Sequence, residues 1–252
     1  MQLLFLRHAT LLIEWNNKKI LIDPMLGAKS SMDPVANAAN TIRNPMLDLP
    51  LDETALQQLL QSLDAVIVTH THRDHWDPAA TQLLPKQLPI FCQWQDEEKI
   101  KAAGFTQVIP VATSHTWEGL TLHRTDGQHG TGEIGQKMAP VSGFVLQGDG
   151  ASLYIAGDTI WCEEVDAALS QYQPAYTIVN AGAAQFISGD PITMTAEDVL
   201  AVITHSANTK VIAVHMETIN HCYLTREALS AAVAAASQAC IIPAPGERIQ
   251  LN

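Results

Sequence analysis

The segment 69–75 carries the side chains in this sequence that are best suited to chemistry. Three histidines and an aspartate fall within six consecutive positions, and they are His70, His72, Asp74 and His75. Imidazole nitrogens and carboxylate oxygens are the ligands that zinc and its neighbours among the transition metals prefer. Chance would place such a cluster in about one in a thousand sequences of this composition, so a solvated polar loop is the weaker interpretation. The segment therefore predicts a metal site.

The elements around this segment explain how it could bind an ion. The apolar, largely β-branched run 65–68 comes directly before it and predicts a buried strand, so the cluster begins where a strand gives way to a loop. His70 and His72 are two residues apart and would point the same way on an extended segment, which lets them bind one ion. Asp74 and His75 follow as the chain turns and could serve a second ion.

A two-metal site needs further ligands from elsewhere in the chain, and strand ends are the expected places. His129 lies in a loop bounded by glycines, which permit the tight backbone that a ligand loop requires. Asp158 follows a predicted strand behind Gly157 and suits a carboxylate shared between two ions. His215 follows the predicted strand 211–214 directly. These three residues complete the predicted ligand set.

Two of these assignments have alternatives in the sequence. His115 could replace His129, and His221 could replace His215; we favour His129 for its loop, and His215 because it follows a strand directly. His221 is then expected to face substrate or to hydrogen-bond a ligand. Asp74 would orient the attacking hydroxide, so Asp74 and His221 are the candidate catalytic residues.

Several other residues have open roles. His8 and Asp23 either support the metal ligands by hydrogen bonding or serve the hairpin that Asp23 ends. Asp126 either orients His129 or caps a turn. His123 and His205 are expected to be ordinary strand and helix residues.

Two irregular segments, 28–50 and 216–223, are expected to shape a substrate pocket. Trp161 and Tyr223 lie close to predicted site residues in sequence, and each is either a pocket wall or ordinary aromatic packing. Four arginines could receive an anionic group, although such side chains more often face solvent: Arg7, Arg43, Arg73 and Arg226.

The expected elements alternate between strands and helices. The expected helices are 52–63 (with Asp52 as N-cap), 78–84, 96–103, 163–169, 196–205 and 226–236, and the expected strands are 11–15, 18–22, 65–68, 89–93, 106–110, 119–124, 143–147, 152–156, 177–179 and 211–214. Both halves show a hairpin that ends in aspartate (Asp23, Asp158) and a later strand that ends in histidine (His70, His215). This weak symmetry suggests two similar halves, with paired sheets inside and helices outside.

Composition limits the function classes. The 252 residues suit one α/β domain over 1–252, and 47% hydrophobic with 16% charged residues is typical of a compact protein. A net charge of −12 argues against a nucleic-acid partner, although bound metal could reverse the sign locally. The four cysteines are far apart and predict free thiols. The apolar run 1–6 is too short for a signal peptide, so we expect a cytoplasmic protein without membrane contact, acting on a small molecule, with homo-oligomerisation left open.

These residues resemble the metallo-β-lactamase superfamily of metallohydrolases. The resemblance rests on segment 69–75, His129, 157–159 and His215, in that order, and spans nearly the whole chain; segments 7–10 and 20–24 look like the branch of ascorbate-6-phosphate lactonase-like proteins. It implies a four-layer αβ/βα sandwich with a dinuclear site at one edge between the sheets. It also implies the following ligand sets: His70, His72 and His129 on one metal, Asp74, His75 and His215 on the other, and Asp158 shared.

The expected function is a hydrolase that uses a metal-bridged hydroxide to cleave a small ester, lactone or phosphodiester. Two divalent ions are expected, with zinc favoured over manganese or iron. The chain has no G-x-S-x-G element and no P-loop, so a serine hydrolase or phosphate-loop enzyme is not indicated. Two alternatives remain: an iron-dependent oxidoreductase or dioxygenase of the same fold, and a metal-binding regulatory protein with slight turnover.

Overall fold

Two mixed β-sheets form the centre of the computed structural model, which describes residues 1–138 and 140–252. The first sheet has the strand order β13-β1-β2-β3-β4-β5-β6 and the second β12-β11-β10-β9-β8-β7. The first comprises β1 (Gln2–Arg7), β2 (Thr10–Trp15), β3 (Lys18–Ile22), β4 (Ala65–Val68), β5 (Ile90–Cys92), β6 (Val108–Pro110) and β13 (Arg248–Gln250). The second comprises β7 (Ser114–Trp117), β8 (Leu120–Asp126), β9 (Ser142–Gly148), β10 (Ala151–Ile155), β11 (Tyr176–Asn180) and β12 (Lys210–Val214).

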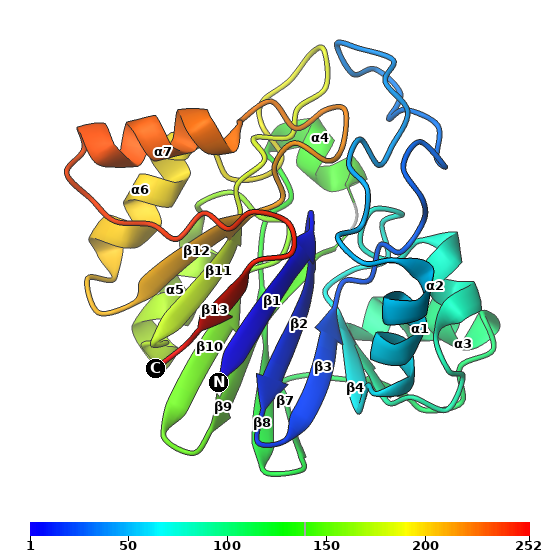
Figure 1. Cartoon of the computed structure of the whole chain (residues 1–252). Coiled ribbons are helices and arrows are strands. Elements are labelled where there is room, and N and C mark those ends of the chain that lie inside the picture. Colours follow the sequence, from blue (N-terminus) through cyan, green and yellow to red (C-terminus); the bar gives the residue numbers. More distant parts are fainter. Residues whose placement is uncertain (139) are drawn as a thin grey trace.

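Helices cover the outer face of each sheet (Figure 1). The helices are α1 (Glu53–Gln61), α2 (Pro78–Leu83), α3 (Glu97–Ala102), α4 (Gly132–Lys137), α5 (Glu163–Tyr172), α6 (Ala196–His205) and α7 (Arg226–Ala235), with the 3₁₀ turn η1 (Trp94–Asp96). The first three pack on the first sheet and α5–α7 on the second. Among the described residues, none of these helices is long and apolar enough to cross a bilayer.

The alternation of side chains along each strand produces these layers. In β1, Leu3 and Phe5 enter the core between the two sheets, whereas Leu4 and Leu6 enter the core beneath α1–α3. On the other sheet Leu153 and Ile155 face the central core, as expected for the same two-residue period. The result is helix, sheet, sheet and helix, so the predicted four-layer αβ/βα sandwich is confirmed.

One edge of the sandwich collects the carboxyl ends of the parallel strands. β3 pairs in parallel with β4, and β10 with β11 and β11 with β12, so their carboxyl ends lie at the top of the view in Figure 1. Three residues at this edge have left-handed backbones: His8, Asp23 and His215, with φ of 56°, 42° and 74°. Such conformations cost about 1–3 kcal/mol each and gather at functional sites. The edge is therefore the place to look for chemistry.

The predicted elements are confirmed with small shifts of their ends, and four further elements appear. These are β1, β7, β13 and α4. β1 has no polar alternation because both of its faces are buried, and β13 is a short strand whose pairing with β1 joins the two ends of the chain. The loop expected from residue 125 begins two residues later, since β8 extends to Asp126.

The predicted symmetry of the two halves is only partly correct. Each sheet does contain a hairpin that ends just before an aspartate, namely β2–β3 and β9–β10. His70 follows β4, which neighbours its hairpin, but His215 follows β12, one strand further from its own. Asn180 ends β11, the strand beside the second hairpin. The two histidines therefore approach the site from non-equivalent strands.

Arg7 is fully buried, which contradicts the expectation that it faces solvent. Its guanidinium donates hydrogen bonds to the backbone carbonyls of Met25 and Leu47, each at 2.9 Å, and to that of Gly27. Burial lowers the pKa of Arg7 to about 10, which leaves it charged at neutral pH. The side chain thus ties the end of β1 to the chain that follows β3 and to segment 28–50.

Replacing Arg7 with methionine is expected to lower the free energy of unfolding by about 2–4 kcal/mol, because three buried carbonyls lose their donor. Denaturant unfolding of the metal-loaded protein measures this difference. Arg248, whose side chain is half exposed, provides the control, and Arg248→Met should change the free energy of unfolding by less than about 0.5 kcal/mol. Equal effects of the two substitutions would contradict the structural role of Arg7.

Candidate metal centre

The structure brings all seven predicted ligand residues together at the strand-end edge. Groups of side chains whose ligand atoms lie within 4.8 Å of one another are His70, His72 and His129; His70, His75 and Asp158; and His8, Asp74, His75 and His215. They come from the loops after β4, β8, β10 and β12 and from the turn between β1 and β2. Residues separated by as many as 207 positions, His8 and His215, therefore meet at one place.

Asp158 lies at the centre of the cluster. Its Oδ2 is 3.2 Å from Nε2 of His75, and its Oδ1 is 3.1 Å from Nε2 of His215. The same Oδ2 lies 3.6 Å from Nε2 of His129 and 3.9 Å from Nε2 of His70. The carboxylate thus contacts histidines of both predicted sets, as a shared ligand must.

The loop that carries Asp158 is shaped by its neighbours. Gly157 has φ +72°, and a Cβ there would lie 2.7 Å from the carbonyl oxygen of Ser142, so this turn needs glycine. Asn180, at the end of β11, donates a hydrogen bond from Nδ2 to Oδ1 of Asp158 at 2.7 Å. Sequence analysis did not identify Asn180; its position at a strand end was the available signal.

The first predicted set consists of three neutral imidazoles. The ring centroids of His70 and His72 lie 4.4 Å apart, and those of His72 and His129 lie 5.3 Å apart. Nδ1 of His129 donates to the carbonyl of Ile192 at 2.7 Å, which turns the lone pair of Nε2 towards Asp158. Burial lowers the pKa of His129 to about 4, and burial with the nearby His75 lowers the pKa of His70 well below its usual range.

The second predicted set contains one unexpected member. Nε2 of His75 and Nε2 of His215 are 3.2 Å apart, and Nδ1 of His75 donates to Asp23 at 2.8 Å. His8 lies beside them: its Nε2 is 3.1 Å from Oδ2 of Asp74, and its ring centroid is 3.6 Å from that of His215. Of the roles left open for His8 and Asp23, the structure supports contact with the site for both.

These contacts fit divalent cations. Nε2 of His70 is buried without a hydrogen-bond partner, and the facing Nε2 atoms of His75 and His215 bring two lone pairs together when both rings are neutral. Burial alone would raise the pKa of Asp158, but His215 and His75 outweigh it and hold the pKa well below its usual range. Ionised carboxylates among imidazole lone pairs are the donor set that zinc, manganese and iron accept.

His75 shows the same demand for positive charge. Burial by itself would lower the pKa of this imidazole, but the carboxylates of Asp158 and Asp23 outweigh burial and raise it well above its usual range. In the same way, burial would raise the pKa of Asp74, but His75 and the hydrogen bond from His8 hold it well below its usual range. A metal ion coordinated by these side chains would supply the charge that the carboxylates attract.

Asp23 fixes the start of the motif as well as the ring of His75. Its Oδ1 accepts a hydrogen bond from the backbone N–H of Thr69, and its Oδ2 accepts one from the Thr69 hydroxyl, both at 2.7 Å. One buried carboxylate therefore orients both the backbone that leads into the motif and a candidate ligand.

Asp23→Asn is expected to weaken metal binding about 10–100-fold, because the amide cannot accept all three of these hydrogen bonds. Competition with a chromogenic chelator measures the affinity. Asp64→Asn is the matched control, since Asp64 accepts a hydrogen bond from the backbone N–H of Lys19 outside the site. Equal affinities in the wild type and Asp23→Asn would contradict this role.

The alternatives from the sequence are separated by the structure. The ring of His115, on β7, packs on Phe91 with 5.4 Å between centroids and belongs to none of the potential ligand groups found among the described residues. The suggestion that Asp126 orients His129 is wrong: Asp126 pairs with Arg124, and the carbonyl of Ile192 orients His129.

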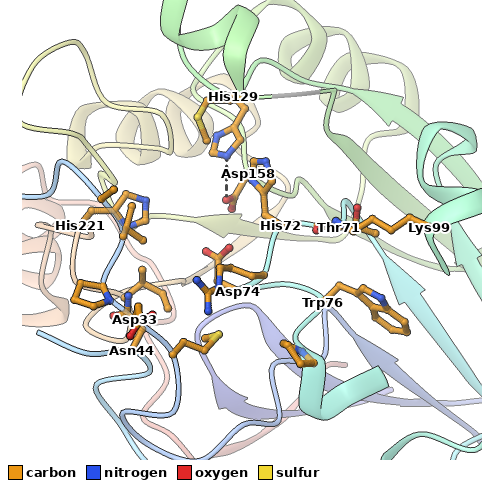
Figure 2. A pocket seen from close by; sticks show the side chains of 18 of the residues that line it. Asp33, Asn44, Thr71, His72, Asp74, Trp76, Lys99, His129, Asp158 and His221 are labelled. Atoms are coloured by element: carbon orange, nitrogen blue, oxygen red, sulfur yellow. Dashed lines mark hydrogen bonds and ion pairs between the residues drawn. The ribbon is translucent and has the colours of Figure 1, made fainter. Parts of the chain in front are cut away.

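A cavity of about 790 Å³ opens onto the cluster (Figure 2). His72, Asp74, His129, Asp158 and His221 line it on the metal side. Much of the remaining lining is apolar: Met32, Pro34, Val35, Ala36, Trp76, Pro78, Ala103, Met138, Phe186 and Ile219. Segments 28–50 and 216–223 therefore shape the pocket, as predicted.

Two aromatic residues do not form this wall. Among the described residues that line the cavity, neither Trp161 nor Tyr223 is present. Trp161 packs against the core under α5–α7, and the Tyr223 hydroxyl accepts a hydrogen bond from the backbone N–H of Ala39. Ordinary packing, rather than a pocket wall, describes both.

Comparison with known proteins places the chain in a family. The model of the beta-lactamase superfamily domain matches residues 18–216. The UPF0173 protein YddR of Bacillus subtilis (strain 168) is 38% identical over 231 residues, which are 89% of each chain. Among solved structures, an isothiocyanate hydrolase from Delia radicum gut bacteria is 37% identical with a TM-score of 0.93, covering 100% of this chain and 99% of the other.

A possible metal-dependent hydrolase from Veillonella parvula DSM 2008 is also similar, at 34% identity and a TM-score of 0.95 over 100% of this chain and 99% of the other. The chain belongs to the beta-lactamase superfamily and, within it, to the UPF0173 group, whose curated members include proteins named metal-dependent hydrolases. The narrower likeness to ascorbate-6-phosphate lactonases stays a prediction.

Proposed function

We propose that this protein is a dinuclear metal-dependent hydrolase that acts on a small, largely apolar molecule with an electrophilic carbon. The observation that carries the proposal is the position of Asp158, whose two oxygens contact histidines of both sets. One carboxylate between two groups of nitrogen ligands is what a pair of adjacent ions requires.

The chain would divide the ligands as the family resemblance implies. His70, His72 and His129 would hold one ion, Asp74, His75 and His215 the other, and Asp158 both. When bound, such ions lower the pKa of a coordinated water towards neutrality and polarise the bond that is attacked. His8 holds Oδ2 of Asp74 at 3.1 Å and so keeps the second carboxylate directed at the cluster.

The lining of the pocket supports a neutral substrate. Arg73 and Lys99 are the lining residues with a full positive charge among those described, and Lys99 donates to the carbonyl of Thr71 at 2.7 Å. Three lining aspartates oppose them: Asp33, Asp74 and Asp158. This balance favours an isothiocyanate, ester or lactone over a phosphodiester.

Isothiocyanates are the first substrates to test, because the solved hydrolase that is 37% identical to this chain carries that name. Water adds to the central carbon of R–N=C=S, and cleavage of the carbon–nitrogen bond gives the amine and carbonyl sulfide. Benzyl isothiocyanate, a phenyl-substituted lactone and bis-p-nitrophenyl phosphate should be compared on zinc- and manganese-loaded protein. Turnover of the phosphodiester alone, or of none of these, would overturn the proposal.

His221 is placed to assist the leaving group. Its side chain is 6% exposed and lines the cavity near the cluster, and its Nδ1 has no hydrogen-bond partner (Figure 2). Burial lowers its pKa, which keeps the ring neutral and able to pass on a proton.

His221→Ala is expected to lower kcat about 100-fold with unchanged metal content, since a positioned proton donor contributes about that much. Steady-state kinetics and metal analysis check this result. His115→Ala, outside the cluster, serves as the control. Loss of metal in the His221 variant would instead identify this histidine as a ligand.

A further inference from the structure

The wall of the pocket beside His221 is a segment with little structure of its own. Between β3 and α1 the described chain forms one isolated bridge, Met32 with Asn44, and is otherwise irregular. Residues 32–36 of this segment line the cavity. Figure 2 shows Asp33 and Asn44 on the same side of the pocket as His221, with Trp76 and Lys99 on the other side. Whatever holds the segment therefore sets the width of the pocket.

Asn220 holds the segment. Its Oδ1 accepts hydrogen bonds from Nδ2 of Asn44 at 2.8 Å and from the backbone N–H of Val35 at 2.9 Å. Its Nδ2 donates to the carbonyl of Asn40 at 3.0 Å. Its backbone N–H donates to Oδ1 of Asn44, and its carbonyl accepts from Nδ2 of Asn40, both at 2.9 Å. One residue thus makes five hydrogen bonds to segment 28–50.

These bonds are enclosed. Asn220 is 1% and Asn44 2% exposed, so water does not compete for them. Buried amides that satisfy each other completely fix one arrangement, whereas removal of one partner leaves the others unpaired at a cost. The neighbours of Asn220 in sequence, Ile219 and His221, both line the cavity. Asn220 therefore connects two walls of the pocket directly.

We propose that Asn220 is a positioning residue that sets substrate selectivity: it fixes the apolar wall 32–36 relative to His221, so that the pocket accepts a substrate carrying an aryl-sized apolar group. The inference rests on the proposed hydrolase function. Asn220 does not touch the reacting atoms, and none of its hydrogen bonds reaches a candidate metal ligand. Its loss should change how a large substrate binds and leave the metal centre as it is.

Kinetics with a large and a small substrate test the proposal. In Asn220→Ala, KM for benzyl isothiocyanate should rise about tenfold, because the side-chain amide of Asn44 and the N–H of Val35 lose their acceptor and the wall is released. KM for methyl isothiocyanate, kcat for both and metal content should stay within about twofold. Asn220→Asp keeps an acceptor for both donors and should recover part of the effect. Asn208→Ala, at an exposed residue after α6, is the control.

A second readout does not depend on turnover. Hydrogen exchange of peptides from 32–46 should quicken in Asn220→Ala but not in the control, whereas peptides from 65–75 should be unchanged. Affinity for 2-phenylethanol, which has no bond that hydrolysis can cleave, should fall about tenfold in parallel. If the wild type hydrolyses none of the substrates, the proposed function fails, and the exchange and affinity measurements still decide the role of Asn220.

The contrary results are specific. An equal rise of KM for the methyl and benzyl compounds, a loss of metal, or unchanged exchange in 32–46 would each overturn the role of Asn220 as a selectivity residue. Unchanged affinity for 2-phenylethanol in Asn220→Ala, or absence of binding to the wild type, would do the same.

Discussion

Asp158→Ala is expected to abolish hydrolysis, with kcat at least about 1,000-fold lower, because the variant loses the carboxylate that both proposed ions share. Metal content should fall from two ions per chain to one or fewer. The reason is the geometry around Asp158: its oxygens lie 3.1 to 3.9 Å from nitrogens of four histidines. Steady-state turnover and elemental analysis of the purified protein check both parts.

Asp126→Ala is the matched control for this substitution. Asp126 ends β8 close to the site in sequence, but its exposed carboxylate pairs with Arg124. Its loss should leave turnover and metal content within about twofold of the wild type, as for most surface substitutions. Full metal content in Asp158→Ala would contradict the shared-ligand role, and circular dichroism of both variants would show whether the fold is retained.

Removal of metal is expected to have the second large effect. Dialysis against a chelator should eliminate turnover, and restoring zinc or manganese should recover it with two ions bound per chain. Because ions bind the folded chain and not the unfolded one, a free ion at 1,000 times its Kd adds about 4 kcal/mol to the free energy of unfolding. For a chain of this size that shift corresponds to about 8–16 °C in Tm.

Calorimetric melting of metal-free and metal-loaded protein measures this difference, and magnesium, which prefers oxygen ligands, is the control ion. Equal Tm values with and without zinc or manganese would contradict a metal centre. Recovery by one iron per chain, with turnover that depends on dioxygen, would favour the oxidoreductase alternative. Full metal binding without turnover of any substrate would favour the regulatory alternative.

The sequence predicted the parts of this protein that local spacing controls. His70 and His72 share a direction because they are two apart after a buried strand, and Asp74 and His75 follow at once. The turn Asn16-Asn17, whose residues have φ of 52° and 58°, joins β2 to β3 as its sequence indicates. Asp52 accepts the hydrogen bond from Ala55 N–H that begins α1. In each case the controlling contact joins residues within a few positions of one another.

The tertiary structure alone decided the contacts between distant segments. His8 meets Asp74 across 66 positions, and Asn44 meets Asn220 across 176, and no pattern near either residue announces its partner. Arg7 is buried because the carbonyls of Met25, Gly27 and Leu47 surround it, which is a property of packed loops. Periodicity fixes which face a side chain occupies, but only the meeting of the two sheets fixes what lies opposite, so the side chains that orient the cluster and hold the pocket wall emerged from packing.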